Sequence, residues 1–469
     1  MRRKLLSMDD VIDRLRDIAG EDNVISDTDG LKGYAYDESG IKEPCMPDIV
    51  IKPSSAAEIS AILRLASKER IPVTVRGAGS NLVGSCLPVR GGIVLSTERM
   101  NRILEIDDEN MVAVVEPGVI TGELCKAAEA KNLYYAGYPM SVETSTIGGN
   151  VAHNAGGGTV IRYGNTGRHV LGLEVVMANG DILSLGGKIR KNTNGYNLIQ
   201  LFVQSEGTLG IFTKITLNLL PLPGRRATLL IAFDTVDDAV RAAPRLMIGL
   251  RSLPLSLELM DRDTAELCSE YLHERFPIKI GGAYLLMQME SDSEDALFAL
   301  CEKAEYLAGA YGALEVFIAD SRIESEKLWR LRMSAGEAGR TADRYVGLEE
   351  AVVPLSEIPE MAKEIKRIAE RYEIKCPLTG HIGDGNVHLM VMKPSAIAPE
   401  DWPELLERFM LEVCKKARAL GGDVSGEHGI GLTRRRIWLE TRSASEIELT
   451  RSLKKALDPR GILNPGKIL

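Results

Sequence analysis

Three of the six histidines in this chain lie in two short glycine-containing segments, Gly380–His388 and Val424–Gly431. His381 and His388 are seven residues apart, and a turn at the intervening glycines would bring both imidazoles to one point. Two imidazoles and one carboxylate form a common catalytic metal site with open coordination positions. Glu427 is the natural carboxylate. The pattern therefore predicts a divalent metal at these side chains, although an isolated histidine is more often a hydrogen-bonded core residue.

The histidine that follows Glu427 directly, His428, needs a separate account. On a strand, adjacent side chains point to opposite faces, so His428 would face away from the metal. In a loop it could instead lie over a substrate. Because this ligand set suits zinc, manganese and iron alike, the residues leave the identity of the metal open.

Glycine is also concentrated in three segments of the first half of the chain, residues 75–85, 145–158 and 205–211. Glycines let backbone N–H groups approach phosphate oxygens closely, and small hydroxyl side chains add further donors. A single segment of this kind is usually a turn. Three in one region indicate a bound cofactor that is rich in phosphate.

The glycines of the first segment are Gly77, Gly79 and Gly84, which is not the G-x-G-x-x-G spacing of a nicotinamide dinucleotide site. Residues 45–225 resemble instead the FAD-binding domain of the vanillyl-alcohol-oxidase-like family. The resemblance rests on the three glycine segments, on Pro53-Ser-Ser and on the run Val-Glu-Pro-Gly that ends at residue 118. It implies an FAD-binding domain built from two subdomains.

In many members of that family a histidine of the first segment bonds the flavin covalently. Ser80, Asn81 and Leu82 occupy this region here, so the resemblance implies that FAD is bound without a covalent bond. It places the FAD contacts in the three glycine segments, in a proline before the second segment and in an asparagine near the C-terminus. These residues are Arg76, Gly77, Ala78, Gly79, Ser80, Asn81, Gly84, Ser85, Pro139, Ser145, Thr146, Gly148, Gly149, Asn150, Asn154, Gly156, Gly157, Glu206, Gly210, Ile211 and Asn464.

The two histidine segments, together with the ending Asp458–Lys467, resemble the FAD-linked D-2-hydroxy-acid dehydrogenases, a group that includes glycolate oxidase flavin subunits and D-lactate dehydrogenases. The resemblance carries the metal-ligand roles onto His381, His388 and Glu427. The resemblance also implies that His428 is the general base and that Arg332 binds the carboxylate of the substrate. A guanidinium suits that role because it binds a carboxylate through two parallel hydrogen bonds.

Some positions depart from the family pattern. Met390 stands where some members have asparagine, and residues 138–141 replace a Pro-Asp-Pro-Gly element. The family's lysine and threonine contacts after the arginine have no clear match between Gly336 and Glu350. These departures affect the identity of the substrate more than the class of reaction.

The resemblance implies hydride transfer from C2 of a small D-2-hydroxy acid, such as D-lactate or glycolate, to flavin N5. Seven cysteines lie far apart in the sequence, which argues against an iron–sulfur cluster within the chain. The electrons are therefore expected to pass to a partner, an electron-transfer flavoprotein or an iron–sulfur subunit. Residues 70–265, for example the run 257–262, resemble lactate dehydrogenase subunits of complexes with electron-transfer flavoprotein.

Three other functions are compatible with an FAD-binding domain. They are an aldonolactone or sugar-alcohol oxidase, a UDP-sugar reductase fed by NADPH, and a non-catalytic FAD-binding subunit of a glycolate oxidase. The paired histidines and the Glu427-His428 segment count against all three, because those relatives are expected to lack them.

The elements that must position these residues alternate between strands and helices. Strands are expected at 49–51, 71–76, 93–95, 112–115, 173–177, 182–185 and 210–220, and helices from Leu5 to Ile18 and after Ser54. The expected fold class is α+β. An FAD-binding domain would span residues 1–224 and an α+β substrate domain residues 225–420, and residues 421–469 would pack back on the FAD domain.

The composition is that of an ordinary globular protein. Of 469 residues, 45% are hydrophobic and 26% charged, and the net charge of −9 comes without a basic block. A nucleic-acid or anionic-membrane surface is therefore disfavoured. No apolar run is long enough for a signal peptide or a membrane span, so a cytoplasmic protein is expected. The oligomeric state, including a homodimer, is left open.

Overall fold

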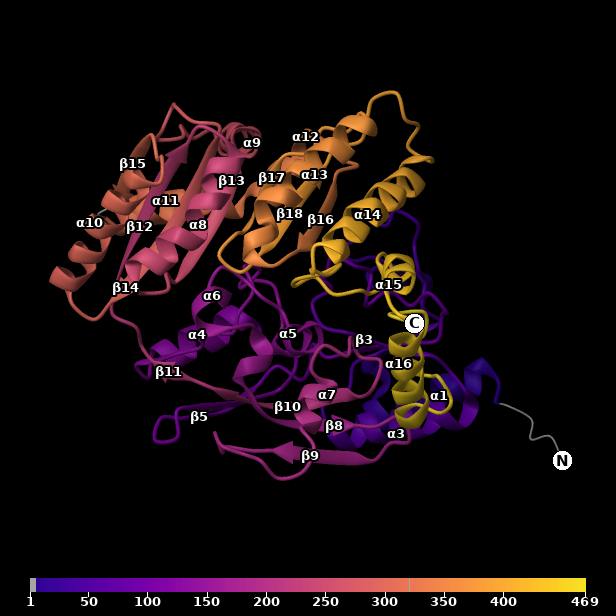
Figure 1. Cartoon of the computed structure of the whole chain (residues 1–469). Coiled ribbons are helices and arrows are strands. Elements are labelled where there is room, and N and C mark those ends of the chain that lie inside the picture. The colour runs from indigo at the N-terminus through magenta and orange to yellow at the C-terminus, as the bar shows by residue number, and fades with distance from the viewer. Residues whose placement is uncertain (1–5, 320) are drawn as a thin grey trace. The chain divides into compact units, whose positions relative to one another are not determined.

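The computed structural model describes residues 6–319 and 321–469, and the chain forms two compact units (Figure 1). The first unit consists of Met1–Gly156, Asn165–Leu222 and Glu427–Leu469. The second unit consists of Gly157–Gly164 and Pro223–Gly426. The chain therefore leaves the first unit twice and returns to it twice.

A four-stranded sheet forms the first layer of the first unit. Its order is β1 (Val24–Ile25), β2 (Ile49–Ile51), β4 (Ile93–Ser96) and β3 (Val73–Arg76). β2, β4 and β3 are parallel, and β1 pairs antiparallel with β2. β2 and β4 are buried along their whole length, which explains their continuous apolar runs.

Helix α3 (Ala56–Glu69) connects β2 to β3, and Ser55 caps its first turn as the sequence predicts. Helix α1 (Met8–Ala19) packs on α3 and buries Val11 and Leu15. The predicted position Leu5 lies outside the described residues. Helix α2 (Thr28–Lys32) and a 3₁₀ turn (Glu21–Asn23) complete this region.

A five-stranded antiparallel sheet forms the second part of the first unit. Its order is β5 (Ile103–Asp107), β6 (Val112–Val115), β10 (Ile211–Asn218), β8 (Val170–Val176) and β9 (Ile182–Gly186). An apolar core joins this sheet to the neighbouring helices. The helices of this part are α4 (Thr121–Glu129), α5 (Ile147–His153) and α7 (Leu198–Phe202), with a 3₁₀ turn at Thr166–His169. The short strands β7 (Leu133–Tyr134) and β11 (Leu220–Pro221) form a separate pair.

The C-terminal segment completes the first unit after helices α15 (Arg435–Thr441) and α16 (Ala444–Leu457). Leu463 forms a parallel bridge with Val73 of β3. The N–H of Val73 donates to the carbonyl of Ile462 at 2.8 Å, and the N–H of Asn464 donates to the carbonyl of Val73 at 2.8 Å. The end of the chain thus extends the sheet that its beginning forms.

A seven-stranded antiparallel sheet forms the centre of the second unit. Its order is β15 (Glu315–Ala319), β12 (Arg225–Phe233), β14 (Ala283–Ser291), β13 (Ser256–Asp261), β17 (Leu378–His381), β18 (Asn386–Val391) and β16 (Gly347–Val352). The sequence order is scrambled, so residues from distant segments become neighbours across the sheet.

Helices cover both faces of this sheet. On one face, Leu230, Met260 and Leu286 pack against Ala265 and Leu328 of α9 and α11. Helices α8 and α10 contact the same central strands. The helices of the unit are α6 (Val160–Tyr163), α8 (Val236–Leu250), α9 (Arg262–Leu272), α10 (Glu294–Ala310), α11 (Arg322–Met333), α12 (Ala335–Ala342), α13 (Ile358–Arg371) and α14 (Trp402–Ala419), with a 3₁₀ turn at Leu355–Glu357.

The seven cysteines are all free. Cys45, Cys125 and Cys376 are partly exposed, and the other four are buried. Spacing along the chain carries no information on the depth of a single small side chain.

Candidate active site

His381 and His388 come together in the hairpin of β17 and β18. His381 is directly opposite Asn386 in the strand register, and His388 lies two residues beyond Asn386 on the same face. The two imidazole rings are perpendicular, with centroids 5.0 Å apart. The turn between the strands contains Gly385, which has a φ of +92°. The predicted convergence of the two histidines is therefore present.

A buried carboxylate, which sequence reasoning missed as a site residue, lies beside this hairpin. Glu258 of β13 is directly opposite His381 of β17. Its Oε1 and Oε2 atoms lie 2.9 and 2.8 Å from Nδ1 of His381. Oε2 also lies 2.8 Å from Nη2 of Arg332, near the end of α11. One glutamate therefore joins the predicted metal ligand to the predicted substrate arginine.

All three of these side chains are buried. Glu258, His381 and Arg332 have exposed fractions of 1%, 4% and 5%. Burial disfavours the charged form of Glu258, but the adjacent His381 and Arg332 outweigh it and hold the pKa of the carboxyl below its ordinary value. Glu258 is therefore an ionised acceptor in the interior of the second unit.

The guanidinium of Arg332 still has hydrogen-bonding capacity. Its Nε and Nη2 atoms have no hydrogen-bond partner among the residues that the structure describes, since the contact of Nη2 with Glu258 is a close ion pair without hydrogen-bond geometry. Buried N–H donors nearly always find an acceptor. Nε and Nη2 form one edge of the guanidinium, which is the edge that binds a carboxylate through two hydrogen bonds.

A second buried carboxylate, also missed, lies on the other side of the hairpin. Glu350 of β16 is directly opposite His388 of β18, and it is fully buried. These two residues offer ligand atoms within 4.8 Å of each other. The hydroxyl of Ser425 donates to Glu350 at 2.6 Å. The imidazole and carboxylate donors of this face are those that zinc, manganese or iron accept.

Glu427 and His428 belong to the first unit. His428 lies in a loop, not in a strand, and its Nε2 is 3.8 Å from a carboxylate oxygen of Glu427. Its Nδ1 is 3.4 Å from Nη2 of Arg434, a buried side chain. The predicted alternation along a strand therefore does not apply to this pair.

His153 holds the same loop, a role that its sequence position did not reveal. Its Nδ1 donates to the main-chain carbonyl of His428 at 3.1 Å. Its Nε2 is 2.8 Å from the hydroxyl of Ser85 in the first glycine segment. The other histidine of this region, His169, is buried with its ring beside Tyr135, which agrees with a structural role.

Glu206 and Asn464 connect the glycine segments of the first unit to its C-terminal part. The carboxylate of Glu206 accepts hydrogen bonds from the N–H groups of Ile430 and Gly431, both at 2.8 Å. The amide of Asn464 donates to the carbonyls of Ser85 and Glu206 at 2.8 and 2.7 Å. Through these hydrogen bonds, both side chains connect the glycine segments to the C-terminal part of the first unit.

The first two glycine segments lie against each other. A Cβ atom at Gly77 would be only 2.4 Å from the hydroxyl oxygen of Thr146. In the first segment, the side-chain oxygen of Asn81 accepts the N–H of Ser85 at 2.9 Å. Arg76 donates to the carbonyl of Tyr36 at 2.8 Å. The guanidinium of Arg76 also lies where a Cβ atom of Gly79 would be, so side chains pack directly on Gly77 and Gly79.

The second segment is built around the start of α5. Thr146 caps this helix, and the hydroxyls of Ser145 and Thr121 lie 2.9 Å apart. Asn150 donates to the same Thr121 hydroxyl at 2.8 Å. A Cβ atom at Gly148 would be 2.6 Å from Pro117. Closely packed, glycine-lined loops of this kind fit the diphosphate of FAD.

The other predicted FAD contacts lie close by in the chain. Asn154 adopts a left-handed conformation at the end of α5 and accepts the N–H of Gly167 at 2.8 Å. Gly156 ends a part of the first unit, whereas Gly157 begins the short second-unit segment. Gly210 directly precedes β10, and the buried Ile211 is its first residue. Pro139 lies in the segment before α5.

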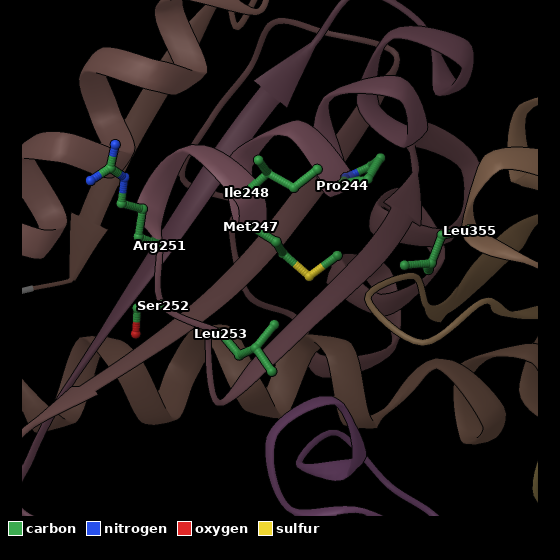
Figure 2. A pocket seen from close by; sticks show the side chains of 7 residues that line it. All are labelled: Pro244, Met247, Ile248, Arg251, Ser252, Leu253 and Leu355. Carbon is green, nitrogen blue, oxygen red and sulfur yellow. The ribbon is translucent and has the colours of Figure 1, made fainter.

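A separate hollow of about 410 Å³ lies in the second unit. It is lined by Pro244, Met247, Ile248, Arg251, Ser252, Leu253 and Leu355 (Figure 2). These residues come from the end of α8 and the loop after it, and from the 3₁₀ turn before α13. The lining offers neither an imidazole nor a carboxylate, so we place the chemistry at the histidine hairpin.

The glycine loops of the first unit and the buried histidine face of the second define a flavin-dependent oxidoreductase. The chain belongs to the FAD-linked oxidases. Residues 47–186 match the family model of the FAD binding domain, and residues 222–468 match that of the C-terminal domain of FAD linked oxidases. FAD is therefore the cofactor, and the predicted α+β fold of the vanillyl-alcohol-oxidase-like type is confirmed.

Relatives of known name cover nearly the whole chain. Glycolate oxidase subunit GlcD of Bacillus subtilis is 40% identical, over 98% of this chain and 96% of its own length. D-lactate dehydrogenase of Archaeoglobus fulgidus is 38% identical, over 90% of this chain and 91% of its own. The solved structure of p-cresol methylhydroxylase shares the fold, with a TM-score of 0.80 at 18% identity over 98% of this chain and 96% of its own.

One finding concerns the membrane. Among the helices that the structure describes, none combines the length and the apolar character needed to cross a bilayer.

Proposed function

We propose that this FAD-linked oxidoreductase oxidises the carbinol carbon of a small D-2-hydroxy acid, such as D-lactate or glycolate, to the 2-keto acid. The observation that carries the proposal is the buried guanidinium of Arg332. It lies beside the histidine hairpin, and its Nε–Nη2 edge makes no hydrogen bond among the described residues, although Nη2 is in an ion pair with Glu258. A small carboxylate would satisfy that edge. The relatives named for glycolate and D-lactate support the same substrate class.

The residues divide the reaction among themselves. Arg332 binds the carboxylate of the substrate and so fixes the orientation of C2. FAD, held by the glycine segments of the first unit, supplies the acceptor for the hydride of C2 at flavin N5. His428 takes the proton of the 2-hydroxyl as general base. The products are the 2-keto acid and reduced FAD.

We further propose a divalent cation with His381, His388 and Glu427 as ligands. Such an ion, when bound, lowers the pKa of a coordinated hydroxyl. His381 and His388 fit this role because they face one another on one side of the sheet. Glu350, opposite His388, adds a carboxylate of the same chemistry.

Reduced FAD must pass its electrons on. We propose a partner protein as acceptor, either an electron-transfer flavoprotein or an iron–sulfur subunit, and the cytoplasm as the place of the reaction. The relative at 40% identity is itself named as a subunit, which supports an assembly.

The test is anaerobic bleaching of the flavin absorbance in the purified holoenzyme by D- and L-lactate and by glycolate, before and after treatment with a chelator. Bleaching by D-lactate or glycolate that the chelator abolishes and Mn²⁺ restores is the expected result. A yellow protein that none of these acids bleaches would contradict the proposed substrate class. Bleaching that survives complete removal of metal would contradict the metal alone.

The base has a test of its own. His428→Ala should lower the rate of flavin reduction by about 100-fold or more while the flavin content stays the same, since general bases typically contribute 10²–10⁴-fold. Equal loss of rate and of flavin would show that His428 only supports the fold.

A further inference from the structure

Glu258 is an unusual residue for its position. It lies in the middle of β13, a central strand of the second unit, with Leu257 and Leu259 on either side in the chain. Only 1% of its surface is exposed. Removing a carboxylate from water costs several kcal/mol unless partners compensate for the lost hydration. Partners must therefore compensate Glu258 for its burial.

Its contact with His381 decides which ring nitrogen carries hydrogen. An ionised carboxylate can only accept hydrogen bonds, and both of its oxygens lie within 2.9 Å of Nδ1 of His381. A neutral ring that donates from Nδ1 to this carboxylate has its lone pair on Nε2. The direct cross-strand pairing of Glu258 with His381 places the two side chains next to each other on one face of the sheet.

Glu258 also contacts Arg332, which belongs to a different element of the second unit. Nη2 of Arg332 is 2.8 Å from Oε2 of Glu258, and the arginine comes from α11, whereas His381 comes from β17. Because a guanidinium is planar, holding Nη2 beside a carboxylate limits the directions in which the Nε–Nη2 edge can point. Gly158 lies close to the same carboxylate, since a Cβ atom there would be 3.3 Å from Oε1.

We propose that Glu258 is a positioning residue that presents Nε2 of His381 to the metal and the Nε–Nη2 edge of Arg332 to the substrate carboxylate. This inference rests on the proposed function. Glu258 touches neither substrate nor metal in this role. It sets the distance and orientation between the two groups that do, so that metal affinity and substrate affinity depend on one buried carboxylate.

The second unit contains a matched control. Glu290 of the neighbouring strand β14 is also buried, with an exposed fraction of 7%. It accepts from the hydroxyl of Tyr163 at 2.7 Å and from Nε of Arg226 at 3.1 Å. It thus has the burial and the cationic partner of Glu258, but none of the proposed site residues among these contacts.

The first experiment compares Glu258→Gln with Glu290→Gln in the full-length holoenzyme. Mn²⁺ binding is followed by the EPR signal of the free ion, and KM and kcat are measured with D-lactate or glycolate. Glu258→Gln should keep its flavin but lose about 10–100-fold in Mn²⁺ affinity, as expected for the loss of a carboxylate behind a ligating histidine. Its KM should rise more than its kcat falls. Glu290→Gln should leave Mn²⁺ affinity and KM within about twofold of wild type.

Unchanged Mn²⁺ affinity and KM in a folded, flavin-loaded Glu258→Gln protein would overturn the proposal, and so would equal losses in both variants. Glu258→Asp is the conservative variant, and partial recovery of Mn²⁺ affinity relative to Glu258→Gln is expected. If Glu258→Gln does not fold, the Glu258→Asp protein carries the comparison.

A second measurement needs neither metal nor substrate. In metal-free protein labelled with ¹⁵N-histidine, long-range ¹H–¹⁵N correlations report the tautomer of each ring, and His381→Gln identifies the signals of His381. The wild type should show hydrogen on Nδ1, and Glu258→Gln should show a mixture. Hydrogen on Nε2 in the wild type would overturn the proposal. If the wild type binds no Mn²⁺, the metal part of the proposed function fails, and this measurement still decides the role of Glu258.

Discussion

The carboxylate of Glu206 accepts a hydrogen bond from the main-chain N–H of Gly431 at 2.8 Å, and its second oxygen accepts that of Ile430. The backbone of Glu206 is left-handed, with a φ of +49°, a conformation that costs free energy in a residue other than glycine. Two hydrogen bonds donated to a charged acceptor outweigh this cost, since each contributes about 1.5–3 kcal/mol. The loop that carries His428 is therefore anchored to the third glycine segment.

Glu206→Gln should slow flavin reduction by D-lactate or glycolate by about tenfold or more. Its amide group would face a main-chain N–H, donor against donor, and the loop of His428 would move. Stopped-flow bleaching at saturating substrate measures the rate. Glu116→Gln is the control, because Glu116 is equally buried in the first unit but pairs with Arg102. Equal slowing in both variants would mean that the effect is one of general stability.

Asn464→Asp should lower the flavin content of the purified protein. The side-chain amide of Asn464 donates to two carbonyls, those of Ser85 and Glu206, and a carboxylate in its place would repel both. The ratio of flavin to protein absorbance measures the loss. Asn179→Asp changes an exposed asparagine of the first unit, and it should keep its flavin. Full flavin content in Asn464→Asp would show that the loops hold their positions without this link.

Gly77→Ala should also weaken FAD binding, by about tenfold or more. The added methyl group would lie 2.4 Å from the hydroxyl of Thr146, so the first and second glycine segments would have to separate. Titration of the apoprotein with FAD, followed by flavin fluorescence, gives the affinity. Gly309→Ala, in α10, meets nothing within 4 Å and should leave FAD affinity unchanged. Since alanine favours helix, Gly309→Ala should stabilise the second unit by about 0.5–1 kcal/mol.

Lys467 should make stability depend on pH in the alkaline range. Burial lowers the pKa of Lys467 to about 8, from an ordinary value of 10.5. The folded protein therefore binds this proton more weakly than the unfolded chain. The resulting cost is full below pH 8 and disappears as the pH rises toward 10.5. Relative to Lys467→Met, the wild type should gain up to about 3 kcal/mol in free energy of unfolding over that range.

Chemical denaturation at a series of pH values from about 7.5 to 10 measures this difference. Lys32→Met removes an exposed lysine and should give a difference that does not change with pH. A constant difference for Lys467→Met as well would mean that the buried amine keeps an ordinary pKa.

Several local elements followed from the sequence. The hairpin of His381 and His388 was predictable because Gly383 and Gly385, between the two histidines, favour a turn. The capped start of α3 and the buried strand Ile49–Ile51 followed from residue type and spacing in the same way. These features depend on neighbours within a few residues.

Glu258 could not be found in this way. In the run Ser256–Asp261 it alternates with leucines, which is the pattern of a strand with one face in water. Its face is buried because His381 and Arg332 meet it from segments more than seventy residues away. Nothing in the short segment Gly157–Gly164 predicts that it belongs to the second unit, because its place there depends on distant partners such as Glu290.

The bridge between Val73 and Leu463 has a consequence for biosynthesis. β3 leaves the ribosome early, but its neighbour Leu463 is translated only after the whole of the second unit. Meanwhile β3 is an unprotected strand edge, the kind of surface that recruits other nascent chains. The residues of the second unit have all emerged before then. We therefore expect the growing polypeptide to depend on chaperones for the first unit and much less for the second.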